Sequence, residues 1–298
     1  MSENVVATYV GYAQDGTIID SFNLCEGDIL KVQEQKAKEA QKRFYKNQTE
    51  LGKMERELGG FYMLYYSEKL FDGVVSNNNI VRVIYLATFI EYGTNRLVIK
   101  EEGKAHVALK EANIQGLLGI KDRGTYYNFK KEIISAGIME IIDGELFMSK
   151  DYFNKGKEQT KNNYFIKMYI NSIRELYNQV APKQHKTLSY LFRLVPYINY
   201  KYNVITTTPH DSSQALKNRL KKEDIAEILG LNLKTYEKVE NQLLKLKITF
   251  RGEVYSLLGL VIVRTDIKRK FYVVNPLLYS SGNDYTVLEN VWARMLKV

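Results

Sequence analysis

The chain has 298 residues, of which 45% are hydrophobic and 26% are charged, a balance typical of globular proteins. This length accommodates one large domain or two to three small ones, so we expect neither a disordered nor a fibrous chain. No apolar run suffices for a membrane helix, and the first residues lack the pattern of a secretory signal. The single cysteine, Cys25, excludes an internal disulfide and a cysteine-based zinc site. We therefore expect a cytoplasmic protein without membrane association.

Basic residues outnumber acidic ones, and the excess is confined to one half of the chain. Overall, 43 Lys and Arg oppose 34 Asp and Glu, a net charge of +9. Residues 1–160 carry 21 basic and 23 acidic side chains, whereas residues 161–298 carry 22 and 11, a net charge of +11. A basic half joined to a near-neutral half indicates one module that meets a polyanion and another with a different task. The alternative is that the extra lysines serve only solubility.

The first sixty residues predict a β-hairpin within 1–30 and a long amphipathic helix at 31–60. The hairpin signal is Asp15-Gly16 between two β-rich runs, and the helix signal is a composition rich in Lys, Glu, Gln and Ala. Small and apolar residues with one Asn recur in the helix at alternating spacings of three and four: Ala37, Ala40, Phe44, Asn47, Leu51, Met54 and Leu58. The part from Phe44 to Leu58 predicts a homodimer, with Asn47 setting the register. Packing of the stripe on its own chain is the open alternative.

The remainder of the chain contains an internal repeat. Phe61-Tyr-Met-Leu-Tyr65 matches Phe165-Ile-Lys-Met-Tyr169, and Ile90-Glu-Tyr-Gly-Thr-Asn95 matches Ile198-Asn-Tyr-Lys-Tyr-Asn203. Ordered apolar matches continue to Ile138 and Ile248, at offsets between 104 and 111 residues. We therefore expect two domains of one architecture, 61–156 and 165–298, joined by a linker at 157–164.

The second copy predicts three helices followed by strands. Apolar residues at helical spacing mark helices at 188–198, 222–229 and from residue 233, with Gly230 ending one and Asn232 capping the next. The strand-rich runs 253–263 and 269–274 then flank a turn at 265–268.

The first copy follows the same order. Its helices are predicted at 109–118 and 123–136, and Asp143-Gly144 is a strong hairpin turn. Helix, short turn, helix and β-hairpin is the order of a winged helix-turn-helix. The predicted fold class is α+β, mainly helical, with two tandem winged helix-turn-helix domains preceded by a β-hairpin and a long helix.

Three segments of the second copy resemble a known family. Phe165-Ile-Lys-Met-Tyr, Leu194-Val-Pro-Tyr-Ile-Asn-Tyr200 and Lys221-Lys-Glu-Asp-Ile-Ala-Glu-Ile-Leu-Gly230 are similar to winged-helix proteins of Firmicute plasmids and phages, including replication initiators of the RepL type. The resemblance covers 165–282 well and 61–156 loosely. It implies a DNA-binding protein of a mobile element, associated with the nucleoid or a plasmid. The tandem arrangement departs from single-module members and is similar in layout to iteron-binding plasmid initiators.

No motif supports an enzyme. The chain lacks a phosphate-binding Gly-x-x-x-x-Gly-Lys-Ser/Thr loop, and its three histidines, His106, His185 and His210, are far apart in the sequence. A tyrosine nucleophile needs cationic groups around the phosphate, and no spacing marks such a set among the 23 tyrosines. We expect no catalytic residue, no metal and no cofactor.

DNA binding has a physical basis in the second copy. With Tyr236, Val239 and Leu243 facing the core, the opposite face of that helix would enter the major groove, where Asn and Lys can bond to base edges. Basic clusters before the first helix of the motif and at the wing tip would contact phosphates. The predicted contacts are Lys221, Lys222, Lys234, Thr235, Lys238, Asn241, Lys245, Arg264, Lys268, Arg269 and Lys270. A solvated helix face is the alternative for each lysine.

The first copy is more ambiguous. Its second helix is locally basic and adds Lys121, Arg123, Thr125, Asn128 and Lys131 to the predicted DNA contacts. Its wing, Met139-Glu-Ile-Ile-Asp-Gly-Glu145, is short and acidic and should avoid phosphate. We expect weaker or differently placed DNA contacts there, or a role in binding protein.

Together these features predict a sequence-specific double-stranded DNA-binding protein of a plasmid or phage, acting with replication or transcription machinery. The resemblance favours replication initiation slightly over transcriptional regulation. The alternative from another class is a protein-interaction adaptor that uses winged helices as docking modules. The first half favours the adaptor, and the net charge of +11 on the second half opposes it.

Overall fold

The computed structural model describes residues 5–12, 18–67, 70–71, 74–99, 106–157, 164–263 and 266–295, with side chains described from residue 33 on except at 262–269. The chain divides into two compact units, Met1–Leu51 and Gly52–Val298. It combines helices with small antiparallel sheets, and this mixed α and β composition agrees with the predicted class.

The first unit consists of a β-hairpin and most of a long helix. Strand β1 (Val5–Tyr12) pairs antiparallel with β2 (Ile18–Cys25), as predicted, and the Asp15-Gly16 turn lies outside the described residues. Helix α1 (Glu26–Glu57) begins directly after β2 rather than near residue 31. The segment Glu26-Gly-Asp28 places two acidic residues in the first turn, a composition that helix N-termini favour.

Helix α1 ends within the second unit at two glycines. Gly59 and Gly60 adopt positive φ (78° and 76°), a region that other residues rarely enter. The chain turns there into strand β3 (Phe61–Tyr66), and a Cβ at Gly59 would overlap the side chain of Asn171. Asn171 Nδ2 also donates to the carbonyl of Glu57 at 3.2 Å, which ties the end of α1 to the start of helix α5 (Ile170–Gln179).

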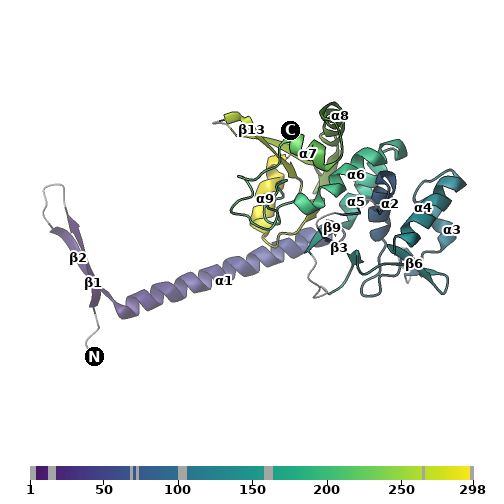
Figure 1. The fold of residues 1–298 in the computed structure, drawn as a ribbon. Coiled ribbons are helices and arrows are strands. Elements are labelled where there is room, and N and C mark those ends of the chain that lie inside the picture. Colours follow the sequence, from purple (N-terminus) through teal and green to yellow (C-terminus); the bar gives the residue numbers. More distant parts are fainter. Residues whose placement is uncertain are drawn as a thin grey trace. The chain divides into compact units, whose positions relative to one another are not determined.

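A four-stranded antiparallel sheet joins the two sequence repeats in the second unit (Figure 1). Its strand order is β14 (Tyr279–Ser280), β9 (Tyr164–Tyr169), β3 and β8 (Phe153–Asn154). The repeated motifs at 61–65 and 165–169 are thus the central strands, and they pair with each other.

The register of these strands gives the two halves a local two-fold relationship. Met63 lies opposite Lys167, and these two residues are also equivalent in the sequence repeat. On either side, β8 pairs with β3 through Asn154 and Met63, while β14 pairs with β9 through Ser280 and Lys167. The duplication inferred from the sequence is therefore built as two halves facing each other across this sheet.

Equivalent helices of the two halves also pack against each other. Helix α2 (Asn77–Ala87) contacts α6 (His185–Arg193), and the ring of Tyr177 on α5 stacks on that of Tyr85 with centroids 3.9 Å apart. Because α2 is apolar on almost every side, it is buried all round, and the core of the unit lies at this pair of helices.

Within the described residues, both halves contain two peripheral helices followed by a hairpin, but the first half has two further strands before them and the second half has a further hairpin and helix after them. In the first half the peripheral elements are β4 (Val98–Ile99), β5 (Val107–Ala108), α3 (Glu111–Leu117), α4 (Arg123–Ser135), β6 (Met139–Ile142) and β7 (Glu145–Met148). In the second they are α7 (Lys222–Ile228), α8 (Leu233–Leu243), β10 (Lys247–Phe250) and β11 (Glu253–Ser256), then β12 (Leu258–Val263), β13 (Asp266–Val274) and α9 (Tyr285–Trp292). Single 3-10 turns occur at Pro182–Gln184, Val195–Tyr197 and Ala293–Met295. The second of these replaces the end of the helix predicted at 188–198, because Pro196 cannot donate a helical hydrogen bond.

The structure corrects one predicted hairpin. The run 253–263 is two strands, β11 and β12, which belong to successive hairpins separated at the fully buried Leu257. The turn of the first hairpin, Arg251-Gly252, has positive φ at both residues (52° and 80°), as a two-residue hairpin loop prefers. The hairpin directly after α8 is therefore β10–β11, and the basic tip predicted as its wing belongs to β12–β13.

Buried His185 makes the stability of the core pH-dependent. Its side chain is 1% exposed, and burial, with a smaller contribution from Arg82, lowers its pKa from 6.5 to about 4. Between these values the unfolded chain binds a proton that the folded chain excludes. The free energy of unfolding should therefore fall as the pH decreases from 6.5 towards 4, by at most about 1.4 kcal/mol per unit.

Denaturant unfolding across this pH range should show a shallower loss of stability for His185→Gln than for the natural chain. The same substitution at the exposed His106 is the control. Equal slopes for the natural chain and His185→Gln would contradict a buried neutral imidazole.

Candidate nucleic-acid interface

Helix α8 begins at a capped turn. Gly230, just after α7, has a φ of 68°, and Asn232 accepts a hydrogen bond from the backbone N–H of Thr235 at 2.8 Å. Both features confirm the sequence prediction, because Gly tolerates positive φ and an Asn oxygen satisfies an unpaired N–H at a helix start. These local interactions fix where α8 begins, and hence which side chains lie on each of its faces.

The inward face of α8 is buried and its outward face is exposed. Tyr236, Val239 and Leu243 are 2%, 6% and 2% exposed, as their spacing predicts. The predicted DNA contacts of this region are all exposed, and they are Lys234, Thr235, Lys238, Asn241 and, just beyond the helix, Lys245. Because residues at i, i+4, i+7 and i+11 share a helix face, the structure brings most of them onto one stripe.

An acidic side chain that sequence analysis did not single out anchors the inward side of α8. Glu240 is 8% exposed and accepts a hydrogen bond from the Tyr272 hydroxyl at 2.6 Å. Burial, together with Glu240, raises the pKa of Tyr272, so the phenol remains the donor. Helical spacing was the signal that could have predicted its burial, because Glu240 lies four residues after Tyr236 and so shares the buried face of the helix.

Lys222 is held in ion pairs with α8. Its Nζ lies 2.8 Å from Glu237 Oε1 and 3.5 Å from Glu240 Oε2, and chiefly the first contact raises the pKa of Lys222. The neighbouring Lys221 is exposed, and its backbone N–H donates to Asp224 Oδ2 at 2.8 Å. Of these two predicted phosphate contacts, Lys221 therefore presents the more accessible charge.

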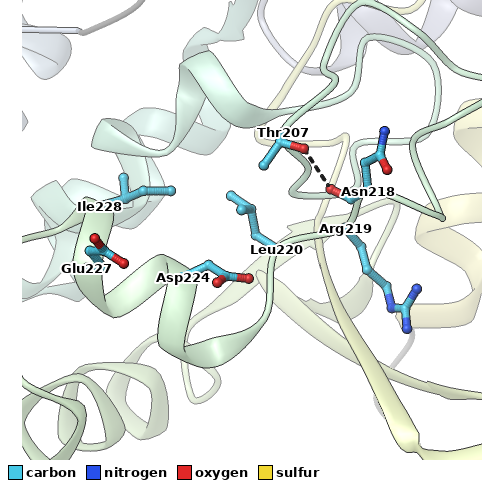
Figure 2. A pocket seen from close by; sticks show the side chains of 7 residues that line it. All are labelled: Thr207, Asn218, Arg219, Leu220, Asp224, Glu227 and Ile228. Atoms are coloured by element: carbon cyan, nitrogen blue, oxygen red, sulfur yellow. Dashed lines mark hydrogen bonds between the residues drawn. The ribbon is translucent and has the colours of Figure 1, made fainter.

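A hollow of about 420 Å³ lies beside the start of α7 (Figure 2). Its lining includes the carboxylates of Asp224 and Glu227, while the side chain of Arg219 extends away from both. The Arg219 guanidinium instead donates to the carbonyl of Leu216 at 2.8 Å. Because carboxylates repel phosphate, this hollow does not suit a nucleic-acid backbone.

The predicted wing residues are only partly described. Lys270 is exposed on β13, whereas the side chains of Lys268 and Arg269 on the same strand, and the whole of Arg264, lie outside the described residues. In the hairpin directly after α8, the turn residue Arg251 forms an ion pair with Glu57 at 2.7 Å. The charge at that turn is thus already paired within the protein.

Helix α4 presents the corresponding surface in the first half. Asp122 accepts a hydrogen bond from the backbone N–H of Thr125 at 2.5 Å, as Asn232 does before α8. The predicted contacts of this half are all exposed, and they are Lys121, Arg123, Thr125, Asn128 and Lys131. Tyr127 and Ile134, 60% and 38% exposed, lie on the same stripe as Lys131, so this face is less polar than that of α8.

Equivalent positions carry an ion pair of opposite polarity in the two halves. In the first half, Lys130 Nζ on α4 lies 2.5 Å from Glu111 Oε1 on α3. In the second half, Glu240 Oε2 on α8 lies 3.5 Å from Lys222 Nζ on α7, and these positions align with Lys130 and Glu111 in the repeat. The second helix is therefore held against the first by the same contact in both halves.

Reversing the pair in the first half tests this equivalence. Lys130→Glu alone brings two carboxylates together and should lower the free energy of unfolding by about 0.5–1 kcal/mol, as for partly exposed ion pairs. Adding Glu111→Lys recreates the polarity of the second half and should restore most of that loss. Denaturant unfolding measures both variants, and a double variant less stable than the single one would show that the pairs are not equivalent.

The stripe predicted as a dimer seam crosses both units. Met54 and Leu58 are 0% and 2% exposed within the second unit, so these two side chains pack in the chain's own core, the alternative that the sequence left open. Leu51 is the last residue of the first unit. In that unit, Phe44 is 59% exposed and Asn47 is half-buried. Pairing of two copies through Phe44 and Asn47 stays a prediction.

Over the part of the chain that the structure describes, no helix is long and apolar enough to cross a membrane. Within those residues, no three His, Cys, Asp or Glu side chains are grouped so as to hold a metal ion. The sequence matches no protein-family model, and no curated protein and no solved structure is significantly similar to it. Function is therefore inferred from the residues of the chain itself.

Proposed function

We propose that the protein binds double-stranded DNA sequence-specifically through the outward face of α8. The observation that carries the proposal is the exposed stripe of Lys234, Lys238 and Asn241, backed by a buried stripe that fixes the helix. The major groove admits an α-helix, and Lys and Asn side chains bond to base edges there. The net charge of +11 over residues 161–298 favours contact with phosphates.

In this proposal, α3–α4–β6–β7 and α7–α8–β10–β11 are two winged helix-turn-helix modules. Each has two helices joined by a short turn and followed by a hairpin, the order of such modules. The matching N-caps at Asp122 and Asn232, and the matching ion pairs between the helices, support a common structure. The sequence resemblance supports a role for them in a plasmid or phage, in replication initiation or transcriptional regulation.

The two-fold relationship of the halves favours a particular form of DNA site. Modules related in this way present their second helices in opposite senses, so a single chain would meet two half-sites in inverted order. Because α4 and α8 carry different outward residues, the two half-sites should differ in sequence.

Selection of DNA fragments bound by the purified full chain tests the proposal. The pool combines random sequences with plasmid and phage DNA, and binding is carried out at two salt concentrations. We expect enrichment of one site that persists at the higher salt. Its two half-sites should differ in sequence and be bound in opposite orientations. Its location at an origin or over a promoter would separate initiator from regulator.

Two outcomes would reject specific binding. Contacts to phosphates alone weaken steeply with salt, in proportion to the number of phosphates neutralised. No enrichment, or enrichment seen only at low salt, would therefore leave nonspecific attraction and favour the protein-interaction adaptor.

A further inference from the structure

The outer face of the first hairpin presents apolar side chains to solvent. On β6–β7, Glu140 and Phe147 are opposite each other and share this face with Ile142, since side chains alternate along a strand. Ile142 is 46% exposed and Phe147 is half-buried, whereas Met139 and Leu146 on the other face are fully buried. One face of the hairpin thus belongs to the core except at Ile141 near the turn, which is 41% exposed, and the other face meets water with large apolar groups.

A groove of about 640 Å³ lies along this outer face. Ile134 on α4 and Gly137 just beyond the helix line it together with Ile142 and Phe147 of the hairpin. Ile134 is 38% exposed, so both walls carry apolar side chains that water reaches. A concave surface with apolar walls is the form that buries anchoring side chains of a ligand.

The second half shows how the matching hairpin is completed. Phe250 and Tyr255 occupy the positions of Ile142 and Phe147 relative to their turn, yet they are only 5% and 9% exposed. Helix α9 packs there, with the ring of Trp292 in edge contact with Phe250 at 6.0 Å between centroids. Helix α9 follows β14, the counterpart of β8, and the described residues between β8 and β9 contain no helix that could take this place.

The covering helix has a simple pattern. Tyr285, Leu288 and Trp292, at i, i+3 and i+7, form its buried stripe. The protein therefore contains one example of the kind of element that fits against this hairpin face: a short amphipathic helix with aromatic and aliphatic anchors.

The charges around the first hairpin favour a basic partner. Its strands and turn carry Glu140, Asp143 and Glu145, of which Glu145 is paired with Arg96 at 3.2 Å. Glu140 and Asp143 are exposed beside the apolar face, with Lys150 the basic residue in the groove lining. Acidic groups next to an apolar surface attract lysine and arginine on the flanks of a bound helix.

We infer that the outer face of β6–β7 docks an amphipathic helix of a partner protein, with apolar anchors at i, i+3 and i+7 and basic residues on its flanks. The anchors fill the groove between Ile134 and Ile142, as Trp292 covers the second hairpin. Lys121 and Arg123 lie at the opposite end of α4, so this site leaves the basic start of that helix accessible. Ile134 shares its helix stripe with Lys131 on α4, whereas the proposed reading face of α8 belongs to the other half of the chain.

A fluorescein-labelled helical peptide tests this inference against the full chain by fluorescence anisotropy. It carries Tyr, Leu and Trp at the spacing of α9, with lysines on both flanks. Two comparison peptides have glutamates on the flanks or a scrambled anchor stripe. We expect the lysine-flanked peptide to bind at least tenfold more tightly than either comparison peptide.

Substitution in the groove locates the binding. Ile142→Lys should weaken the lysine-flanked peptide at least tenfold, while Ile141→Lys, a change of similar exposure on the other face of the same strand, should have little effect. Circular dichroism and DNA selection with both variants show whether the fold and the reading face of α8 are intact.

Three results would overturn the inference: equal binding of all peptides, equal loss for both substitutions, or concentration-dependent self-association that Ile142→Lys abolishes. The last would mean that the face pairs with a second copy of the chain. Because the peptide assay contains no DNA, its failure leaves the DNA-binding proposal standing, and the converse also holds.

Discussion

The double variant Lys234→Ala with Lys238→Ala is expected to lose sequence-specific DNA binding while the fold persists. Both side chains are exposed on α8, so their removal leaves the buried stripe of Tyr236 and Leu243 in place. A good base contact supplies about 1–3 kcal/mol of discrimination, so two such contacts correspond to a loss of roughly 30-fold or more in affinity for the selected site. Titration of the selected site against a shuffled one, at fixed salt, measures the loss.

A matched control separates base reading from charge. Lys42→Ala with Lys46→Ala removes two exposed lysines at the same spacing from a helix, α1, and so changes the net charge equally. If this variant loses specific binding as fully as the α8 variant, nonspecific attraction accounts for the effect. If the α8 variant still prefers the selected site, α8 is not the reading helix.

Local signals predicted the surroundings of α8 well. The cap at Asn232, the positive φ of Gly230 and the inward residues Tyr236 and Val239 each depend on a few neighbouring residues, and all are present. Such features are encoded by steric and hydrogen-bonding preferences within a turn or two of helix.

Contacts between distant segments were not predictable in the same way. The bond from Tyr272 to Glu240 joins residues 32 apart in the sequence, and the pairing of β3 with β9 joins residues about a hundred apart. The sequence showed that 61–65 and 165–169 are alike, but likeness does not specify pairing. Pairing depends on the whole core, including the packing of α2 against α6.

The misplaced hairpin has a specific cause. Asp143-Gly144 is a favoured pair for a two-residue hairpin loop, whereas Arg251-Gly252 is not, although both adopt positive φ at each residue. With that turn unrecognised, the β-rich run 253–263 predicts one strand. Its division at Leu257 is set by backbone bonds to Leu246 and Asn275, which no local pattern reveals.

The stripe on α1 shows a further limit of periodicity. A spacing of three and four predicts an apolar helix face but not the partner that covers it. Met54 and Leu58 continue the same pattern as Phe44, yet they are fully buried while Phe44 is largely exposed. The environment of each residue depends on which other segments pack nearby.

Trp292→Ala is expected to lower the free energy of unfolding of the second unit by about 3–5 kcal/mol, the usual cost of truncating a large aromatic residue in a core. Trp292 is 4% exposed, and its ring lies 6.0 Å from that of Phe250 and 5.5 Å from that of Tyr285. Removal of the indole leaves a cavity between α9 and β10–β11. Because domains are stable by only about 5–15 kcal/mol, this change would remove a large share of the free energy of unfolding.

Denaturant unfolding followed by circular dichroism measures this change, because Trp292 is the single tryptophan of the chain and its fluorescence disappears with it. Asn290→Ala, at an exposed position of the same helix, should change stability little. A loss below about 1 kcal/mol for Trp292→Ala would contradict the packing of α9 on the second hairpin. It would also remove the internal precedent for a helix on the first hairpin. In that case α9 would not be needed to cover Phe250 and Tyr255, the counterparts of Ile142 and Phe147.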